Sequence, residues 1–162
     1  MSLELHKLRV YPSKETLAKE DQLAYKMAQV AQDTTDISDD VIDMVINRII
    51  DNASVAIASV NRTPVMNARA QALGHAREGG ANVFGLANDV KVHAEWAAWA
   101  NGTAVRELDY HDTFLAADYS HPGDNIPPIL AVAQQLGKNG NDVLRAITVA
   151  YEIHVNLVKA IC

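Results

Sequence analysis

Residues 38–59 read SDDVIDMVINRIIDNASVAIAS, and their apolar side chains return every three or four positions. That spacing places the apolar side chains on one face of an α-helix. Ser38 is a suitable N-cap residue, and Asp39 and Asp40 suit the positive end of the helix dipole. The stretch therefore predicts a long helix with one buried face.

The rest of the chain predicts further helices around this one. An irregular arm over residues 1–19 precedes them, and glycine, proline and asparagine mark most of their ends. The expected helices span about 20–32, 63–76 before Gly79 and Gly80, 93–105, 126–137, and from a cap at Asn141 onward, with a brief extended piece at 81–86. These patterns predict an all-α fold in which residues 1–162 form a single helical domain.

The alanine-rich helix expected at 93–105 has the composition of a tightly packed core helix. Trp96 and Trp99 are interpreted as core anchors, and Gly102 suggests a close contact with another helix, since glycine there costs about 1 kcal/mol relative to alanine. His154, on the apolar stripe of the last helix, is interpreted as a core or interface residue rather than a ligand.

Composition and charge exclude several classes of function. The chain has 162 residues, of which 49% are hydrophobic and 21% charged, which is typical of a soluble globular protein. No window reaches the roughly 18 uninterrupted apolar residues of a membrane span, and the N-terminus lacks the pattern of a secretory signal. The net charge of −6 argues against nucleic acid as a partner. The single cysteine, Cys162, cannot form an internal disulfide, so we expect a cytoplasmic protein.

Residues 101–125, NGTAVRELDYHDTFLAADYSHPGDN, concentrate the side chains that carry chemistry. The candidate groups are Asp109, His111, Asp112, Thr113, Asp118, His121 and Asp124. An acid, an alcohol and an imidazole are adequate parts for proton transfer, in which the acid and the histidine exchange protons and the threonine positions a substrate oxygen. This segment is therefore the candidate site.

Helical spacing predicts which of these groups meet. If the helix from residue 93 continues to about Thr113, Asp109 and Thr113 share one face and His111 points elsewhere. His121 comes from a loop before Pro122, where an imidazole can approach the end of the helix. We therefore expect a carboxylate beside a hydroxyl, with an imidazole within reach.

A metal site is the alternative interpretation of the same segment. His111 and Asp112 spell the His-Asp dipeptide of metal-dependent phosphohydrolases, which are also helical, and Asp109 or His121 are conceivable as further ligands. A dipeptide is weak evidence for a metal site. On one helix, the side chains of Asp109 and His111 would also point in different directions.

Two segments of the chain resemble the MmgE/PrpD family. They are AAWANGTAVRELDYHDTF at 97–114, which is similar to the family's NG followed by an LD-aromatic-x-DT pattern, and SHPGDNIPPILAVAQ at 120–134, which is similar to its HP-small-DN segment before a helix. A weaker similarity extends through NRIIDNASVAIAS at 47–59. The segments look most like the methylcitrate dehydratase branch of the family.

The resemblance implies a fold and an activity. Complete members join an all-α domain to a smaller α+β domain, and they work as homodimers without an iron-sulfur cluster or other cofactor. The implied reaction removes water from 2-methylcitrate, a small tricarboxylate, to give 2-methyl-cis-aconitate in propionate breakdown. The alternatives are a related cis-aconitate decarboxylase and a helical domain that only associates with a partner.

The resemblance also implies roles for five residues. Asp109, Thr113 and His121 fall on the family's catalytic positions, Asp112 and Asn125 fall near the substrate, and no metal is implied. Which of the acid and the histidine donates the proton stays open.

The chain departs from the family in two respects. His111 stands where many members carry an acid or asparagine, and the family's further histidine and lysines are expected beyond residue 162. Residues 92–126 offer six acids against one cation, Arg106, whereas a tricarboxylate needs cationic partners. We therefore expect this chain, taken as a fragment, to bind the substrate poorly alone.

Overall fold

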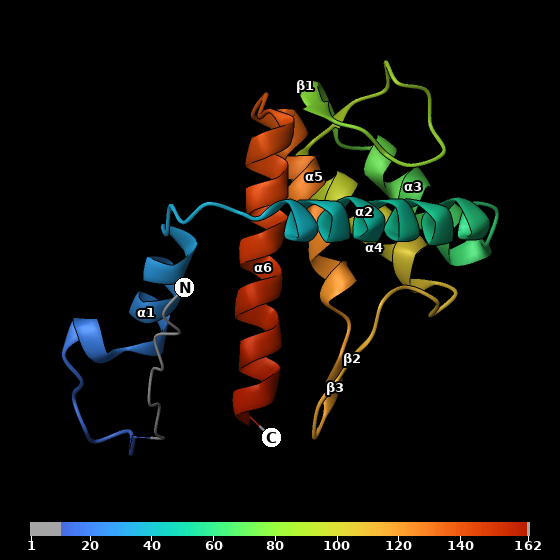
Figure 1. Ribbon diagram of the computed structural model, residues 1–162. Coiled ribbons are helices and arrows are strands. Elements are labelled where there is room, and N and C mark those ends of the chain that lie inside the picture. The colour runs from blue at the N-terminus through green and yellow to red at the C-terminus, as the bar shows by residue number, and fades with distance from the viewer. Residues whose placement is uncertain (1–10, 162) are drawn as a thin grey trace. The chain divides into compact units, whose positions relative to one another are not determined.

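The computed structural model describes residues 11–161, and the chain separates into two compact units after Thr35 (Figure 1). The first unit contains a 3-10 turn, η1 (Lys19–Asp21), and helix α1 (Leu23–Ala31), which confirms the helix predicted there. The first ten residues of the arm and Cys162 lie outside the described residues, so the interpretations made for them stay predictions.

The second unit is mostly helical, which confirms the predicted fold class. Its helices are α2 (Asp39–Ser59), α3 (Thr63–Leu73), α4 (Ala94–Arg106), α5 (Ile126–Gln135) and α6 (Gly140–Ile161). The other elements are the strands β1 (Ala76–Ala81), β2 (Phe114–Leu115) and β3 (Tyr119–Ser120), and the 3-10 turn η2 (Pro122–Asn125). Within residues 11–161, no helix combines the length and the apolar character that crossing a membrane requires.

Alanine side chains on α4 let three other helices approach it closely. Ala97, Ala100 and Ala104 are buried, and α4 contacts α2, α3 and α5 (Figure 1). A methyl side chain takes up little space between two helix backbones, so the helices pack closely here. The alanine-rich segment is therefore a core helix, as predicted.

Two predictions for α4 are wrong. Trp99 is 56% exposed, because it lies off the buried alanine face, and only Trp96 packs against the core. Gly102 has open space around it, since an added Cβ would meet no atom within 4 Å outside its own helix. The close contacts of α4 therefore come from alanines, while Trp96 stacks on His75 with ring centroids 3.7 Å apart.

The segment after α3 also differs from the prediction. Helix α3 ends at Leu73, before the predicted end at 76, and the extended piece is β1 rather than 81–86. Tertiary pairing decides this, because both ends of β1 form isolated bridges to Val92. Gly80 permits the close approach, since a Cβ there would clash with the Val92 carbonyl oxygen.

Helix α6 starts earlier than predicted and is fixed at its centre. Asn139, rather than Asn141, caps it: the Asn139 side chain accepts the Asp142 N–H at 3.0 Å, and the Asp142 carboxylate accepts the Asn139 N–H at 3.1 Å. This reciprocal arrangement satisfies two main-chain donors at the start of the helix. Further along, the fully buried Ile147 packs in one apolar cluster with Val45 of α2 and the first residue of α5.

Ser38 occupies the N-cap position of α2, as predicted, but its hydroxyl bonds to Asp40 instead of capping a main-chain N–H. That bond lowers the pKa of the Asp40 carboxyl. A lowered folded-state pKa adds stability above the unfolded-state pKa, and this stability is lost as the pH falls through the folded-state value. We expect Ser38→Ala to raise the Asp40 pKa toward its ordinary 3.8, which an NMR titration of the carboxyl carbons measures. An unchanged pKa would contradict this assignment.

Candidate active site

The chain turns sharply at Asp109 instead of continuing as a helix. Helix α4 ends at Arg106, and Asp109 adopts a left-handed backbone conformation with φ of 54°. The Asp109 N–H donates to the Arg106 carbonyl oxygen at 3.1 Å, and Arg106 Nη1 lies 3.4 Å from the Asp109 carboxylate. Aspartate tolerates this backbone region better than most residues. The prediction that Asp109 and Thr113 share a helical face is therefore wrong.

A short hairpin brings Thr113 and His121 together. Strands β2 and β3 pair antiparallel with Phe114 opposite Ser120, so the residues just outside this pair face each other. Thr113 Oγ1 lies 3.3 Å from His121 Nδ1. The hydroxyl and the imidazole thus meet through strand pairing rather than through helical spacing.

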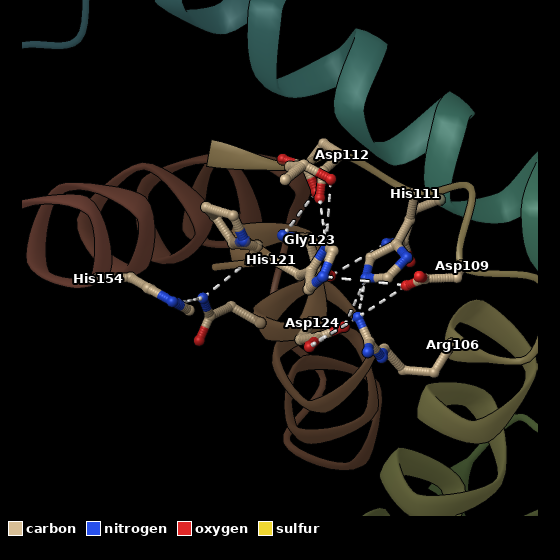
Figure 2. A network of polar contacts seen from close by, with 12 residues as sticks. Arg106, Asp109, His111, Asp112, His121, Gly123, Asp124 and His154 are labelled. Carbon is tan, nitrogen blue, oxygen red and sulfur yellow. Dashed lines mark hydrogen bonds and ion pairs between the residues drawn. The ribbon is translucent and has the colours of Figure 1, made fainter. Parts of the chain in front are cut away.

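The contacts of His121 determine which of its ring nitrogens is free. Nδ1 lies 3.2 Å from the main-chain carbonyl oxygen of Asp112. A carbonyl oxygen only accepts hydrogen bonds, so Nδ1 carries the proton of the neutral ring and Nε2 holds a lone pair. Nε2 lies 3.9 Å from the Asp109 carboxylate (Figure 2). A free imidazole nitrogen beside a carboxylate is equipped to accept a proton.

His111 lies in the same cluster, although the sequence predicts that it points elsewhere. Its side chain is fully buried, and Nε2 lies 2.9 Å from the Asp124 carboxylate and 3.1 Å from Arg106 Nη1 (Figure 2). The ring centroid is 4.7 Å from that of His121. The turn at Asp109 is the physical reason, because helical spacing no longer separates the directions of these side chains.

Asp109, His111 and His121 are also close enough to be considered as metal ligands, since each offers a ligand atom within 4.8 Å of the other two. Positive charge is already present at this position. Arg106 Nη1 lies 3.1 Å from His111 and 3.4 Å from Asp109, so a metal ion there would be repelled and would have to displace the guanidinium. The geometry favours an arginine-bridged proton-transfer cluster over the metal-dependent interpretation of the His-Asp dipeptide.

Asp112 is turned into the protein, away from this cluster. Its side chain is 9% exposed; Oδ1 accepts the Gly123 N–H at 2.7 Å and Oδ2 accepts the Tyr151 hydroxyl at 2.9 Å, while Arg48 lies 3.9 Å from Oδ2. Burial, together with the Asp112 charge, raises the pKa of Tyr151, so its hydroxyl keeps the proton that it donates. Sequence reasoning missed Tyr151 and Arg48, because they lie on α6 and α2, far from residues 101–125.

Gly123 is held at both of its main-chain groups. Its N–H donates to Asp112, and its carbonyl oxygen accepts the side-chain amide of the buried Asn52 at 3.0 Å. A Cβ at this position would clash with the Asp112 carboxylate and lie 3.2 Å from the Asn52 amide. The position therefore requires glycine because of space.

Gly123→Ala is expected to lower the free energy of unfolding by about 1–3 kcal/mol, because the added methyl group displaces the Asp112 carboxylate and leaves buried polar groups unpaired. Urea denaturation measures this change. Gly102→Ala is the matched control, since its Cβ would enter open space and alanine favours the helix. Equal destabilisation of both variants would contradict the steric explanation.

Asn125 takes part in a separate polar contact. Its side-chain amide donates to the Pro122 carbonyl oxygen at 2.9 Å and to His154 Nδ1 on α6 at 2.8 Å. Asn125 and His154 line a hollow of about 410 Å³ whose other walls are apolar side chains of α6. The structure therefore brings Asp109 and Thr113 each within 3.9 Å of His121, while Asn125 pairs with His154.

Residues 21–162 match the family model of the MmgE/PrpD N-terminal domain, and this match covers most of the chain. The chain belongs to the MmgE/PrpD family. The family assignment made from the sequence segments is thereby confirmed, and the helical fold of the second unit agrees with it.

Curated relatives of this MmgE/PrpD chain carry the name 2-methylcitrate dehydratase. The chain is 48% identical over 69 residues to the probable 2-methylcitrate dehydratase of Saccharomyces cerevisiae, over 35% of the chain and 13% of the relative. It is 38% identical over 64 residues to 2-methylcitrate dehydratase of Salmonella typhimurium, over 40% of the chain and 13% of the relative. It is also 38% identical over 80 residues to the mitochondrial 2-methylcitrate dehydratase of Yarrowia lipolytica, over 43% of the chain and 15% of the relative. The chain thus matches only a small part of the length of these relatives.

Proposed function

We propose that this chain supplies the proton-transfer groups of a hydro-lyase that removes water from 2-methylcitrate and forms 2-methyl-cis-aconitate in propionate breakdown. The observation that carries this proposal is the free Nε2 of His121 beside Asp109, with the Thr113 hydroxyl at the other ring nitrogen. The names of the relatives support the choice of substrate. The chemistry uses side chains alone, without a cofactor.

Dehydration beside a carboxylate needs a base for the carbon-bound proton and an acid for the leaving hydroxyl. In this proposal His121 Nε2 accepts the carbon-bound proton, and the Asp109 carboxylate stabilises the resulting imidazolium from 3.9 Å. The imidazolium then gives this proton to the Asp109 carboxylate, and Asp109 passes it to the leaving hydroxyl. Water departs as the double bond forms, and both side chains return to their starting protonation states. The single N–H of His121 Nδ1 is shared between the Asp112 carbonyl oxygen at 3.2 Å and Thr113 Oγ1 at 3.3 Å, so the hydroxyl proton of Thr113 stays free for a substrate oxygen.

The substrate's carboxylates require more positive charge than this cluster offers. Arg106 already lies 3.4 Å from Asp109 and 4.0 Å from Asp124. We propose that further cations come from a second copy in a homodimer or from segments that correspond to the remaining length of the relatives. The cytoplasmic location stays a prediction, and the name of one relative places that protein in the mitochondrion.

A comparison of three substrates in the presence of a chelator tests the function. The chain is incubated at high concentration with 2-methylcitrate, citrate or cis-aconitate, and the ultraviolet absorbance of the unsaturated product and the release of carbon dioxide are followed. We expect chelator-resistant conversion of 2-methylcitrate. Carbon dioxide from cis-aconitate would instead support the decarboxylase alternative. Absence of any conversion, at a concentration where a second copy can contribute its cations, would contradict a catalytic role of this chain by itself and favour a helical association domain.

A further inference from the structure

We propose that Asp112 and Tyr151 are positioning residues that hold His121 in the tautomer needed for proton transfer, and that neither contacts the substrate. The catalytic part of this inference rests on the proposed function, whereas the tautomer is measurable without turnover. The inference also changes the expected role of Asp112, which the family resemblance places near the substrate.

Burial and hydrogen bonding leave Asp112 unsuited to bind a substrate. Its side chain is 9% exposed, and each carboxylate oxygen already accepts a hydrogen bond, one from the Gly123 N–H at 2.7 Å and one from the Tyr151 hydroxyl at 2.9 Å. A substrate anion would also be repelled by a carboxylate at this position. The side chain of Asp112 therefore acts on the protein itself.

Asp112 holds the histidine loop on both sides of Pro122. Its main-chain carbonyl oxygen accepts a hydrogen bond from His121 Nδ1 at 3.2 Å, and its carboxylate binds the N–H of Gly123 at 2.7 Å (Figure 2). The first bond places the imidazole proton on Nδ1, and the second fixes the backbone that carries the ring. A hydrogen bond at one imidazole nitrogen determines which nitrogen is free for chemistry. Asp112 thereby leaves Nε2 free on the side of Asp109.

Tyr151 connects this arrangement to the helical core. Its hydroxyl, on α6, donates to the Asp112 carboxylate, and its burial favours the protonated form that donates. One helical turn earlier on α6, Ile147 is fully buried against α2 and α5, so the backbone that carries Tyr151 is anchored by packing. The cation beside this carboxylate, Arg48, is 41% exposed and lies 3.9 Å from Asp112, which makes it a weaker constraint. The packed helix α6 thus restrains the position of His121 through two hydrogen-bonded side chains, those of Tyr151 and Asp112.

Tyr151→Phe tests this role, because it removes the hydroxyl and keeps the ring. In histidine labelled with ¹⁵N, the ring nitrogens of His121 are expected to show the proton on Nδ1 in the parent chain and a mixture of the two tautomers in the variant. We also expect kcat for 2-methylcitrate to fall about 10-fold to 100-fold with little change in KM. Residues that orient a functional histidine without touching the substrate typically have effects of this size. Tyr110→Phe is the matched control, since it removes the same hydroxyl from a ring that is 80% exposed.

Asp112→Asn is the second variant, and it keeps the inference testable if Tyr151→Phe folds poorly. The amide has the shape of the carboxylate but carries no charge, so its bonds to Gly123 and Tyr151 weaken and the same loss of tautomer order is expected. An unchanged His121 tautomer in both folded variants would overturn the positioning role. Absence of turnover in the parent chain would count against the proposed function alone, because the ring nitrogens still report whether the tautomer depends on Asp112 and Tyr151.

Discussion

Replacing His121 with glutamine is expected to lower kcat for 2-methylcitrate by about 10²-fold to 10⁴-fold, with a much smaller change in KM. Glutamine has a similar length and still forms hydrogen bonds, but it offers no basic nitrogen in place of Nε2. The loss therefore falls on the chemical step rather than on binding. Initial rates over a range of substrate concentrations separate the two parameters.

His93→Gln is the matched control for this variant. His93 lies just before α4, and its Nδ1 is 3.3 Å from Arg77, in contact with neither Asp109 nor Thr113. We expect its kcat to stay within about 2-fold of the parent value, as for a substitution that removes no transition-state interaction. Equal losses in both variants, or a change in KM alone for His121→Gln, would contradict the assignment of His121 as the base.

Replacing Ile147 with alanine is expected to lower the free energy of unfolding by about 2–5 kcal/mol. Ile147 is fully buried and packs with Val45 and Ile126, so the truncation leaves a cavity among α2, α5 and α6. The same cavity loosens the helix that carries Tyr151, so we also expect lower activity in the folded fraction. Urea denaturation followed by circular dichroism measures the change in stability.

Ile57→Ala removes the same atoms from a side chain on α2 that is 69% exposed. We expect it to change the free energy of unfolding by no more than about 0.5 kcal/mol, because the atoms it removes bury little apolar surface in the folded protein. Similar destabilisation of the two variants would show that α6 is not anchored through Ile147.

Helical periodicity was sufficient to predict most of the fold. The pattern in residues 38–59 and the alanines of 93–105 predict α2 and α4 nearly to the residue, because one-sided burial leaves a repeat of three and four positions. One error arose where distant residues decide local structure, and another where two nearby asparagines could each cap the same helix. The bridges from β1 to Val92 replace the end of a helix by an extended segment, and the capping bonds of Asn139 start α6 before Asn141.

The sequence was sufficient to identify the residues of the candidate site but not their arrangement in space. Asp109, Thr113 and His121 stand out because they lie close together in sequence. Their approach depends on a left-handed turn and a two-residue hairpin, which the helical interpretation of this segment did not include. Tyr151 carries no local signal at all, since a tyrosine on the apolar stripe of a helix resembles an ordinary core residue.

The ring nitrogens of His121 in the unmodified chain give the most direct test of the proposed chemistry. With ¹⁵N-labelled histidine and NMR at a pH where the ring is neutral, we expect the proton on Nδ1 and a free lone pair on Nε2. A proton found on Nε2 would contradict the assignment of His121 as the base, because the nitrogen that faces Asp109 would then have no lone pair to offer.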